Sequence, residues 1–312
     1  MSEYFEFDSL RKSHQQCFEF ITLNKSCLTK TNFDDEQQRK SALNKLREKI
    51  GSSIDYALKD KSCLYDEDFL NRFLFARKFD SDLAYNLLIN YFQYKERYKD
   101  TLLKKLNIYD PKIQLAIREG CPYILKERDR KGRKILAFFA SNWSTSFLLE
   151  DIYRALLLSL EKLLEDRQNQ SCGFVAIVDW TNVTFKQSSQ LNPLILKIIA
   201  NGLQDSFPVR FKAVHFVGQP WYIEIAFTAM KPFLTEKNWD RIKFHSRNFF
   251  SLHNYFPKDV LPAELGGEAI HLNSTDWLNQ LIESNKDDIK SHKSYKLVDN
   301  IGLLPNFDNN TV

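Results

Sequence analysis

The sequence predicts an α/β fold in which a small helical module precedes a mostly parallel sheet. Helical periodicity dominates residues 34–105, whereas short, continuously apolar runs alternate with amphipathic helices after about residue 111. Continuous apolar runs are typical of strands that are covered on both faces, and strand–helix alternation favours parallel pairing. At 312 residues, the chain has room for one large domain or two smaller ones.

The helical module is predicted from three segments. Between Asp34 and Leu58, one helical face collects Leu43, Leu46 and Ile50 among charged residues. Asp66 and Asp80 each precede an amphipathic run, so we expect them to be N-caps. The apolar positions of these two runs are Phe69, Leu70, Phe73 and Leu74, and then Leu83, Leu87, Leu88, Tyr91 and Phe92.

The remainder alternates between strands and helices. The expected strands are Lys134–Ala140, Gly173–Trp180, Ala213–Val217 and Ile242–His245. Amphipathic helices are expected at Glu150–Asp166 and Ser188–Leu203, with a last amphipathic turn around Trp277 to Ile282. We therefore divide the chain into an extension (1–33), a helical module (34–110), the sheet domain (111–275) and a polar tail (276–312) that we expect to be mobile.

The segment after His215 has an unusual composition. The pattern predicts a long helix, carrying Trp221 to Leu234, that is apolar on more than one face, and a charged second helix after it. Such a helix must be buried or must lie against lipid. Because it carries Glu224 and Lys231, it is too polar to span a bilayer. It is either an ordinary core helix or a lid over a lipid cavity.

Composition and motifs argue against several function classes. The net charge of +4 does not indicate a nucleic-acid binder. The N-terminus lacks a signal-peptide layout, and no run of about 18 apolar residues exists. Dinucleotide, Walker, GxSxG, HExxH and CxxC motifs are absent from the sequence, so we expect no enzyme, no cofactor and no metal. Asp179 ends a predicted strand, where a carboxylate is either catalytic or caps the following turn.

Several motifs carry a family resemblance. FLNRFLFARKFDSDLAYNLLINYFQYKERY resembles the helical N-terminal module of the CRAL-TRIO lipid-binding family. Four further stretches resemble the lipid-binding domain of the same family: VDWTNVTFKQSSQLNP, GLQDSFPVRFKAVHFVGQPWYIEIAF, MKPFLTEK and LPAELGGE. The resemblance covers about residues 40–272 and is strongest to the branch that holds the clavesins, cellular retinaldehyde-binding protein and alpha-tocopherol transfer protein.

The resemblance implies a sheet that floors a lipid cavity, with the helix from Gly218 to Arg241 as a mobile gate. Such a pocket is concave and mostly apolar. The candidate lining residues are Tyr153, Leu156, Leu157, Leu160, Ile177, Asp179, Phe185, Leu191, Leu194, Ile195, Ile198, Ile199, Ile223, Phe227, Met230 and Phe233. In the tocopherol protein, serines stand where this chain has Leu156 and Leu160, which argues against tocopherol as the ligand.

Four basic residues form a candidate phosphoinositide site. Arg210 and Lys212 are two apart in an extended segment, so they point to the same side, whereas Lys237 and Arg241 are four apart on a helix. In the tocopherol protein, basic residues at these four motif positions bind a phosphoinositide head group. The alternative is a solvated basic surface, with Glu236 and Asp240 as helical partners of the cations.

Three functions remain open on this basis. The first is a cytosolic, monomeric lipid-transfer protein that holds one retinoid, tocopherol or similar molecule and exchanges it at phosphoinositide-containing membranes. The second is a phosphoinositide-binding adaptor, peripherally attached to endosomal or trans-Golgi membranes, that does not transfer lipid. The third is a hydrolase or oxidoreductase, for which the sequence shows no catalytic constellation.

Overall fold

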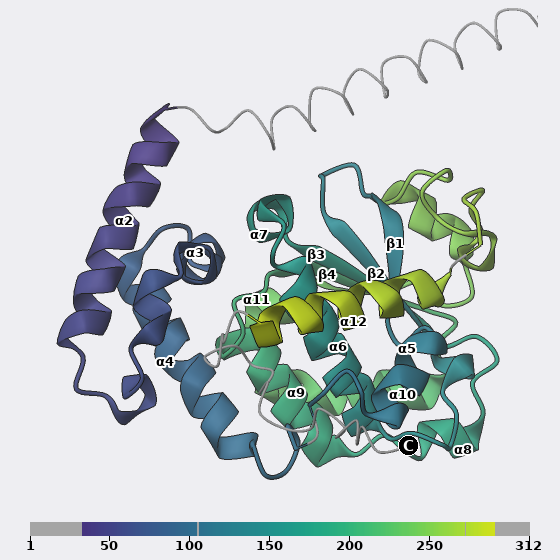
Figure 1. Ribbon diagram of the computed structural model, residues 1–312. Helices are drawn as coiled ribbons and strands as arrows, with labels where there is room; N and C mark the ends of the chain where they lie inside the picture. The colour runs from purple at the N-terminus through teal and green to yellow at the C-terminus, as the bar shows by residue number, and fades with distance from the viewer. Residues whose placement is uncertain (1–32, 105, 272, 291–312) are drawn as a thin grey trace, which may run out of the picture.

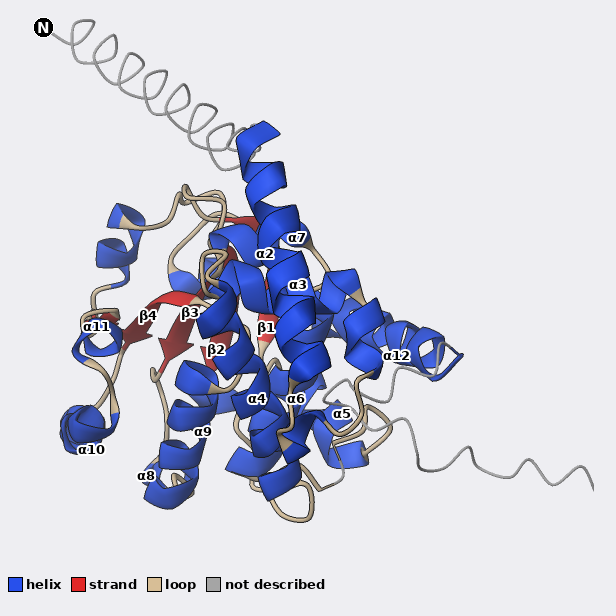
Figure 2. Cartoon of the chain, turned by 90° about the vertical axis from the view of Figure 1, so that its left-hand side faces the viewer, coloured by secondary structure: helices blue, strands red, loops and turns tan. Residues whose placement is uncertain are grey.

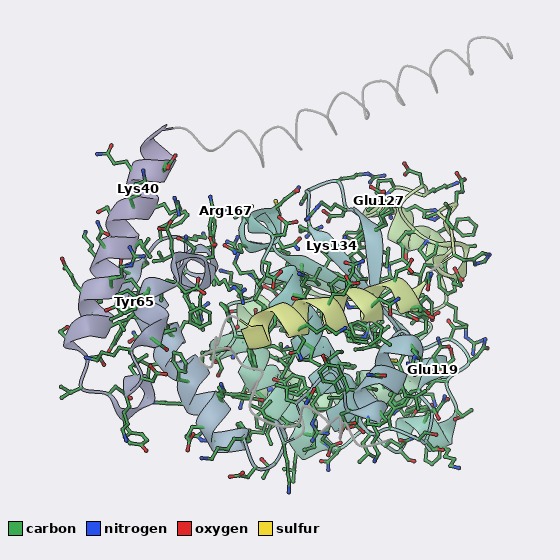
Figure 3. All side chains as sticks on the ribbon, viewed as in Figure 1. Lys40, Tyr65, Glu119, Glu127, Lys134 and Arg167 are labelled. Atoms are coloured by element: carbon green, nitrogen blue, oxygen red, sulfur yellow. The ribbon has the colours of Figure 1, made fainter. Side chains whose placement is uncertain are left out.

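The computed structural model describes residues 33–104, 106–271 and 273–290 (Figure 1). Residues 1–32 of the predicted N-terminal extension and most of the predicted polar tail lie outside these residues. The helical module contains α2 (Phe33–Ser52), η1 (Tyr56–Leu58), η2 (Ser62–Tyr65), α3 (Glu67–Ala76) and α4 (Ser81–Tyr98). Figure 3 shows Tyr65 on the outside of this module, where its side chain is exposed.

The predicted N-caps of this module are confirmed. The Asp66 carboxylate accepts a hydrogen bond from the amide of Phe69, and Asp80 accepts from the amides of Asp82 and Leu83. These bonds satisfy amide groups that the first helical turn leaves without partners. The predicted inner face of α2, with Leu46 and Ile50, is fully buried.

A five-stranded sheet forms the centre of the second part, in the order β1-β2-β3-β4-β5. The strands are β1 (Tyr123–Arg128), β2 (Lys134–Phe139), β3 (Phe174–Asp179), β4 (Phe211–Val217) and β5 (Ile242–Phe244). β1 is antiparallel to β2, and all other neighbours are parallel. The α/β prediction and its mostly parallel sheet are therefore confirmed.

The helices after α4 surround this sheet. They are α5 (Pro111–Arg118), η3 (Ala140–Asn142), α6 (Leu149–Leu163), α7 (Arg167–Cys172), α8 (Phe185–Ser188), α9 (Pro193–Asp205), α10 (Trp221–Met230), η4 (Lys231–Phe233), α11 (Glu236–Trp239), η5 (Phe249–Asn254), η6 (Ala263–Leu265) and α12 (Ser274–Lys290). Figure 2 shows α11 beside β4, and places α8 and α9 between α10 and α6.

Alternate residues of the strands face two different apolar layers, because successive side chains point to opposite faces of a sheet. Leu136 and Phe174 belong to the layer that contains the α6 helix and the helical module. Ile135 and Ile177 belong to the opposite layer, which is covered by the segment from η5 to η6. That second layer includes Leu252, Phe256, Leu261 and Leu265.

Two expected helices have different bounds because the sequence contains proline. The helix predicted at Ser188–Leu203 starts later than expected, because α9 begins at Pro193 with Asn192 as its N-cap, and the preceding α8 ends at Ser188. The gate helix that the resemblance implies from about Gly218 to Arg241 is divided into α10, η4 and α11, with Pro232 in η4, and α11 is the charged second helix that the pattern predicts. Proline cannot donate the amide hydrogen bond of a helix interior, so it starts or ends a helix.

Other elements were missed or underestimated. β1 was not predicted, because its sequence YILKER is short and half polar, as befits an edge strand. The last amphipathic turn is a helix of 17 residues, α12. Its Leu278 and Leu281 are buried in the same apolar cluster as α6, and the indole of Trp277 donates to Ser159 Oγ at 3.0 Å.

A buried histidine pair lies between β4, the end of β5 and η5. His215 Nδ1 is 2.8 Å from His245 Nε2, and their rings stack with centroids 5.1 Å apart. The other ring nitrogen of His245 bonds Ser251 Oγ. Burial lowers the pKa of His215 to about 3, with further lowering by His245, and burial also lowers the pKa of His245.

These lowered pKa values predict acid sensitivity. The unfolded state takes up protons below about pH 6.5 while the folded state does not, so stability falls as the pH drops from 6.5 toward 3. His215 alone should cost about 2 kcal/mol of unfolding free energy between pH 7 and pH 5. Urea unfolding at both pH values measures this loss. His215→Leu should make the unfolding free energy less dependent on pH below 7, whereas His253→Gln should leave that dependence as in wild type. If the unfolding free energy falls equally with pH in all three proteins, His215 is not the cause.

Candidate functional site

One wall of the candidate pocket is formed by α6. Its residues Tyr153, Leu156, Leu157 and Leu160 are all buried. Four half-buried side chains pack against the same apolar cluster from α9 and the segment before it: Leu191, Ile195, Ile198 and Ile199. The amphipathic spacing therefore brings these eight predicted residues together on two facing elements.

The Tyr153 side chain also reaches the helical module. Its hydroxyl lies 3.1 Å from the hydroxyl of Tyr94 on α4, and burial is the main cause that raises the pKa of both phenols. Gly202 on α9 leaves room for this contact, since a Cβ there would come within 2.8 Å of the Tyr153 oxygen. The polar atom of Tyr153 is thus held where α4, α6 and α9 meet.

The gate, defined here as residues 221–239 from α10 to α11, packs on the sheet through part of its surface. Ile223 is buried, and the half-buried Phe227 ring lies 4.3 Å from that of Phe216 on β4. The Tyr222 hydroxyl is 3.2 Å from Ser188 Oγ on α8. Leu191 packs against both the gate cluster and the α6 cluster, so the two predicted walls are contiguous.

Another part of this region is apolar and exposed. Trp221 and Ile225 on α10 are 73% and 59% exposed. Predicted lining residues on the neighbouring elements share this exposure: Phe185 at 77%, Leu194 at 72% and Phe233 at 39%. Exposed large apolar side chains on neighbouring helices are typical of interaction surfaces, including membrane-binding ones.

Two predicted lining residues lie elsewhere. Ile177 is fully buried in the apolar layer on the other face of the sheet. Its side chain points to the same face as that of Val175, whereas the side chain of Val178 points toward the gate cluster. Asp179 accepts a hydrogen bond from the amide of Thr181 at 2.8 Å, and burial raises its pKa. It caps the turn after β3, which is one of the two roles expected from its position. The side chain of Met230 lies outside the described part of α10.

The four predicted basic residues come together beside α11. Burial lowers the pKa of Lys212 to about 8, and the positive charges of Arg210, Arg241, Lys78 and Lys237 lower it further. Burial and Arg241 also lower the pKa of Arg210. We call these five side chains the basic cluster. The lowering of these two pKa values by neighbouring cations indicates that like charges are close together.

Arg210 also has a structural role. Its Nη2 donates to the backbone oxygen of Gln170 at 2.7 Å and to that of Ser171, at the end of α7. Its Nε is buried and has no hydrogen-bond partner among the described residues. Within those same residues, none of the five cations of the basic cluster forms a salt bridge. An unpaired donor among uncompensated positive charges favours the binding of an anion.

Lys78 is the member of the cluster that the sequence did not indicate. It lies in the turn between α3 and α4 and has a positive φ of 54°. The residues next to Lys78 in the sequence do not indicate that it lies near Lys212 of β4, because this proximity depends on how the helical module packs against the sheet domain. The signal available in the sequence was the adjacent Arg77-Lys78 at a predicted helix end.

Comparison with known proteins decides the family. A CRAL/TRIO domain model matches residues 118–267. Clavesin-1 of Xenopus laevis is 46% identical over 238 residues, which cover 75% of this chain and 71% of that protein. The chain belongs to the CRAL-TRIO family. Clavesin-2 of Homo sapiens is likewise 46% identical, over 224 residues that cover 72% of this chain and 68% of that protein.

Both the family and the clavesin-like branch expected from the motifs are thus confirmed. Among solved structures, the crystal structure of Sfh5 covers 83% of this chain and 100% of its own, with a TM-score of 0.42 and 12% identity. CRAL-TRIO membership supports a lipid-binding or lipid-transfer protein. Within the described ranges, no helix has the length and apolar character needed to cross a bilayer.

Proposed function

We propose that this CRAL-TRIO protein holds one hydrophobic small molecule and exchanges it at membranes that contain phosphoinositides. The observation that carries the proposal is the two-sided character of α10. One side packs on the sheet and on the cluster next to α6 through Ile223 and Phe227, whereas Trp221 and Ile225 face outward. A helix of this kind is stable over an apolar pocket and can also bury its outer face in lipid.

The exchange needs no chemical step. A membrane that binds the open gate more tightly than the closed gate shifts the population toward the open state. The basic cluster lies beside α11, at the end of the gate, so an anionic head group bound there would hold the gate at the bilayer surface. The proposed residues of this site are Arg210, Lys212, Lys237, Arg241 and Lys78.

The pocket wall narrows the choice of ligand. Leu156 and Leu160 are apolar and buried, and they offer no hydroxyl group to a polar ligand atom. A retinoid-like molecule is the better candidate for this apolar wall, which disfavours tocopherol and other ligands that depend on hydrogen bonds. We propose a cytoplasmic monomer that attaches peripherally to endosomal or trans-Golgi membranes.

The alternative is an adaptor that docks on the same membranes without carrying lipid. The basic cluster favours it, because anion binding there does not require the gate to open. Under this alternative, the apolar residues of α6 and α9 are only a core, and their close packing contributes to stability rather than to uptake.

Mass spectrometry of the lipid extracted from purified protein tests the two functions. A hydrophobic molecule recovered at about one per chain, and transferred to acceptor liposomes, would support the transfer protein. Protein that is empty after expression and takes up no retinoid, tocopherol, sterol or phospholipid, yet still floats with phosphoinositide liposomes, would establish the adaptor instead.

A further inference from the structure

A chain of hydrogen bonds connects the basic cluster to α9. Arg241 Nη1 donates to Asn238 Oδ1 at 3.0 Å, and Asn238 Nδ2 donates to Gln204 Oε1 at 2.7 Å. Gln204 Nε2 then donates to Asp205 Oδ2 at 3.0 Å. This series of hydrogen bonds thus connects Arg241, a cation of the proposed head-group site, to the Asp205 carboxylate on α9, the helix that supplies one wall of the proposed pocket.

The charged ends fix the direction of every bond in this chain. A guanidinium only donates, so Asn238 must present its oxygen to Arg241 and keep its NH2 group for Gln204. A carboxylate only accepts, so Gln204 must present its NH2 group to Asp205 and its oxygen to Asn238. Neither amide can turn over without breaking a bond at both of its ends, and aligned bonds of this kind strengthen one another.

The same oxygen holds the end of the gate. Gln204 Oε1 also accepts from the backbone amide of Thr235 at 3.2 Å, where the chain passes from η4 to α11. Close by, the ammonium of Lys197 on α9 lies 4.3 Å from the centre of the Phe233 ring. One acceptor on α9 therefore fixes both the backbone and the Asn238 side chain at the C-terminal end of the gate.

We propose that Gln204 and Asn238 form a latch that keeps the gate on α9, and that an anionic phosphate group bound by Arg241 releases it. This inference rests on the function proposed above. A phosphate is a stronger acceptor for a guanidinium than an amide oxygen. When Arg241 turns to the phosphate, Asn238 loses the partner that orients it, and the bond to Gln204 is lost with it.

Hydrogen exchange of the gate amides without any anion tests the latch. The Thr235 amide is a direct reporter, because it donates to Gln204. Gln204→Met keeps the size of the side chain but removes the acceptor, so exchange at residues 231–239 should become about tenfold faster than in wild type. Gln204→Glu combined with Asp205→Asn keeps an acceptor for both donors and reverses the bond between positions 204 and 205, since the new amide can donate to the new carboxylate. This double variant should exchange as slowly as wild type. Equal rates in wild type and Gln204→Met would overturn the latch.

Inositol 1,4,5-trisphosphate, which carries the phosphate groups without a lipid chain, tests the release. It should accelerate gate exchange about fivefold in wild type and have no further effect in Gln204→Met. Because coupling between binding and release is reciprocal, Gln204→Met should bind the probe, as measured by calorimetry, up to about fivefold more tightly than wild type. If the probe binds to wild type and leaves gate exchange unaltered, the coupling is wrong and the head-group site stands. If it does not bind to wild type at all, the head-group site fails together with the release, and the first experiment alone decides whether Gln204 holds the gate.

Discussion

Replacing Glu161 with leucine should lower the free energy of unfolding by about 3 kcal/mol. Glu161 on α6 pairs with Arg72 of α3 at 2.8 Å, and it also accepts a hydrogen bond from the Tyr91 hydroxyl of α4 at 3.1 Å. The Arg72 and Glu161 side chains are only 5% and 14% exposed. Without the carboxylate, a buried guanidinium is left without its charge partner, which costs more than the ion pair contributes when intact.

Urea unfolding followed by circular dichroism measures this loss, and two further variants separate its causes. Glu96→Gln removes the exposed Lys99–Glu96 pair and should change stability by less than about 0.5 kcal/mol. The double variant Arg72→Leu, Glu161→Leu should regain much of the loss, because the unpaired charge is gone. A Glu161→Leu protein as stable as Glu96→Gln would show that this contact does not hold the helical module on α6.

This contact also shows what the sequence does not contain. Helical periodicity assigned Arg72 and Glu161 to helices, but nothing in either helix marks the two residues as partners. In the sequence, each reads as a solvated charge on an amphipathic helix. Their pairing follows from the docking of α3 and α4 against α6, which is a property of the tertiary fold.

The fold itself could largely be predicted from local patterns. Continuous apolar runs gave β2, β3 and β4 to within two residues of their observed bounds. Asp66 and Asp80 can be identified as caps because short acidic side chains suit that position. The helix start at Pro193 and the break at Pro232 can also be read from the sequence, since proline limits helices, but the apolar periodicity around each proline outweighs that signal.

The candidate site was predicted less completely. To place Ile177, one must know which face of the sheet its side chain points to and which helices cover that face. The second point depends on the tertiary fold and not on the strand's own sequence. Phe185 and Leu194 were expected to line the pocket, yet both side chains are exposed, one on α8 and one at the start of α9. Lys78 and Asn238 depend on contacts between distant segments that spacing cannot reveal.

Changing Lys78, Lys212 and Lys237 together to glutamine should weaken binding to liposomes that contain phosphatidylinositol bisphosphate about 100-fold, because each lysine near an anionic surface contributes about 1 kcal/mol. This variant spares Arg210 and Arg241, which bond to backbone oxygens and to Asn238. The loss should shrink as salt rises, because exposed charge contacts are screened. Liposome flotation across salt concentrations measures it.

The lowered pKa of Lys212 adds a second signature to the same experiment. Because its pKa is about 8, Lys212 loses its charge as the pH rises from 7 to 9, so wild-type binding should weaken over that range. The triple variant, which lacks Lys212, should be less sensitive to pH. Lys104, Lys112 and Lys258 are exposed lysines outside the cluster, and changing them to glutamine alters the net charge equally. If this matched variant loses as much binding, the cluster is only part of a general basic surface; if it floats like wild type while the cluster variant does not, the head group is recognised by these residues.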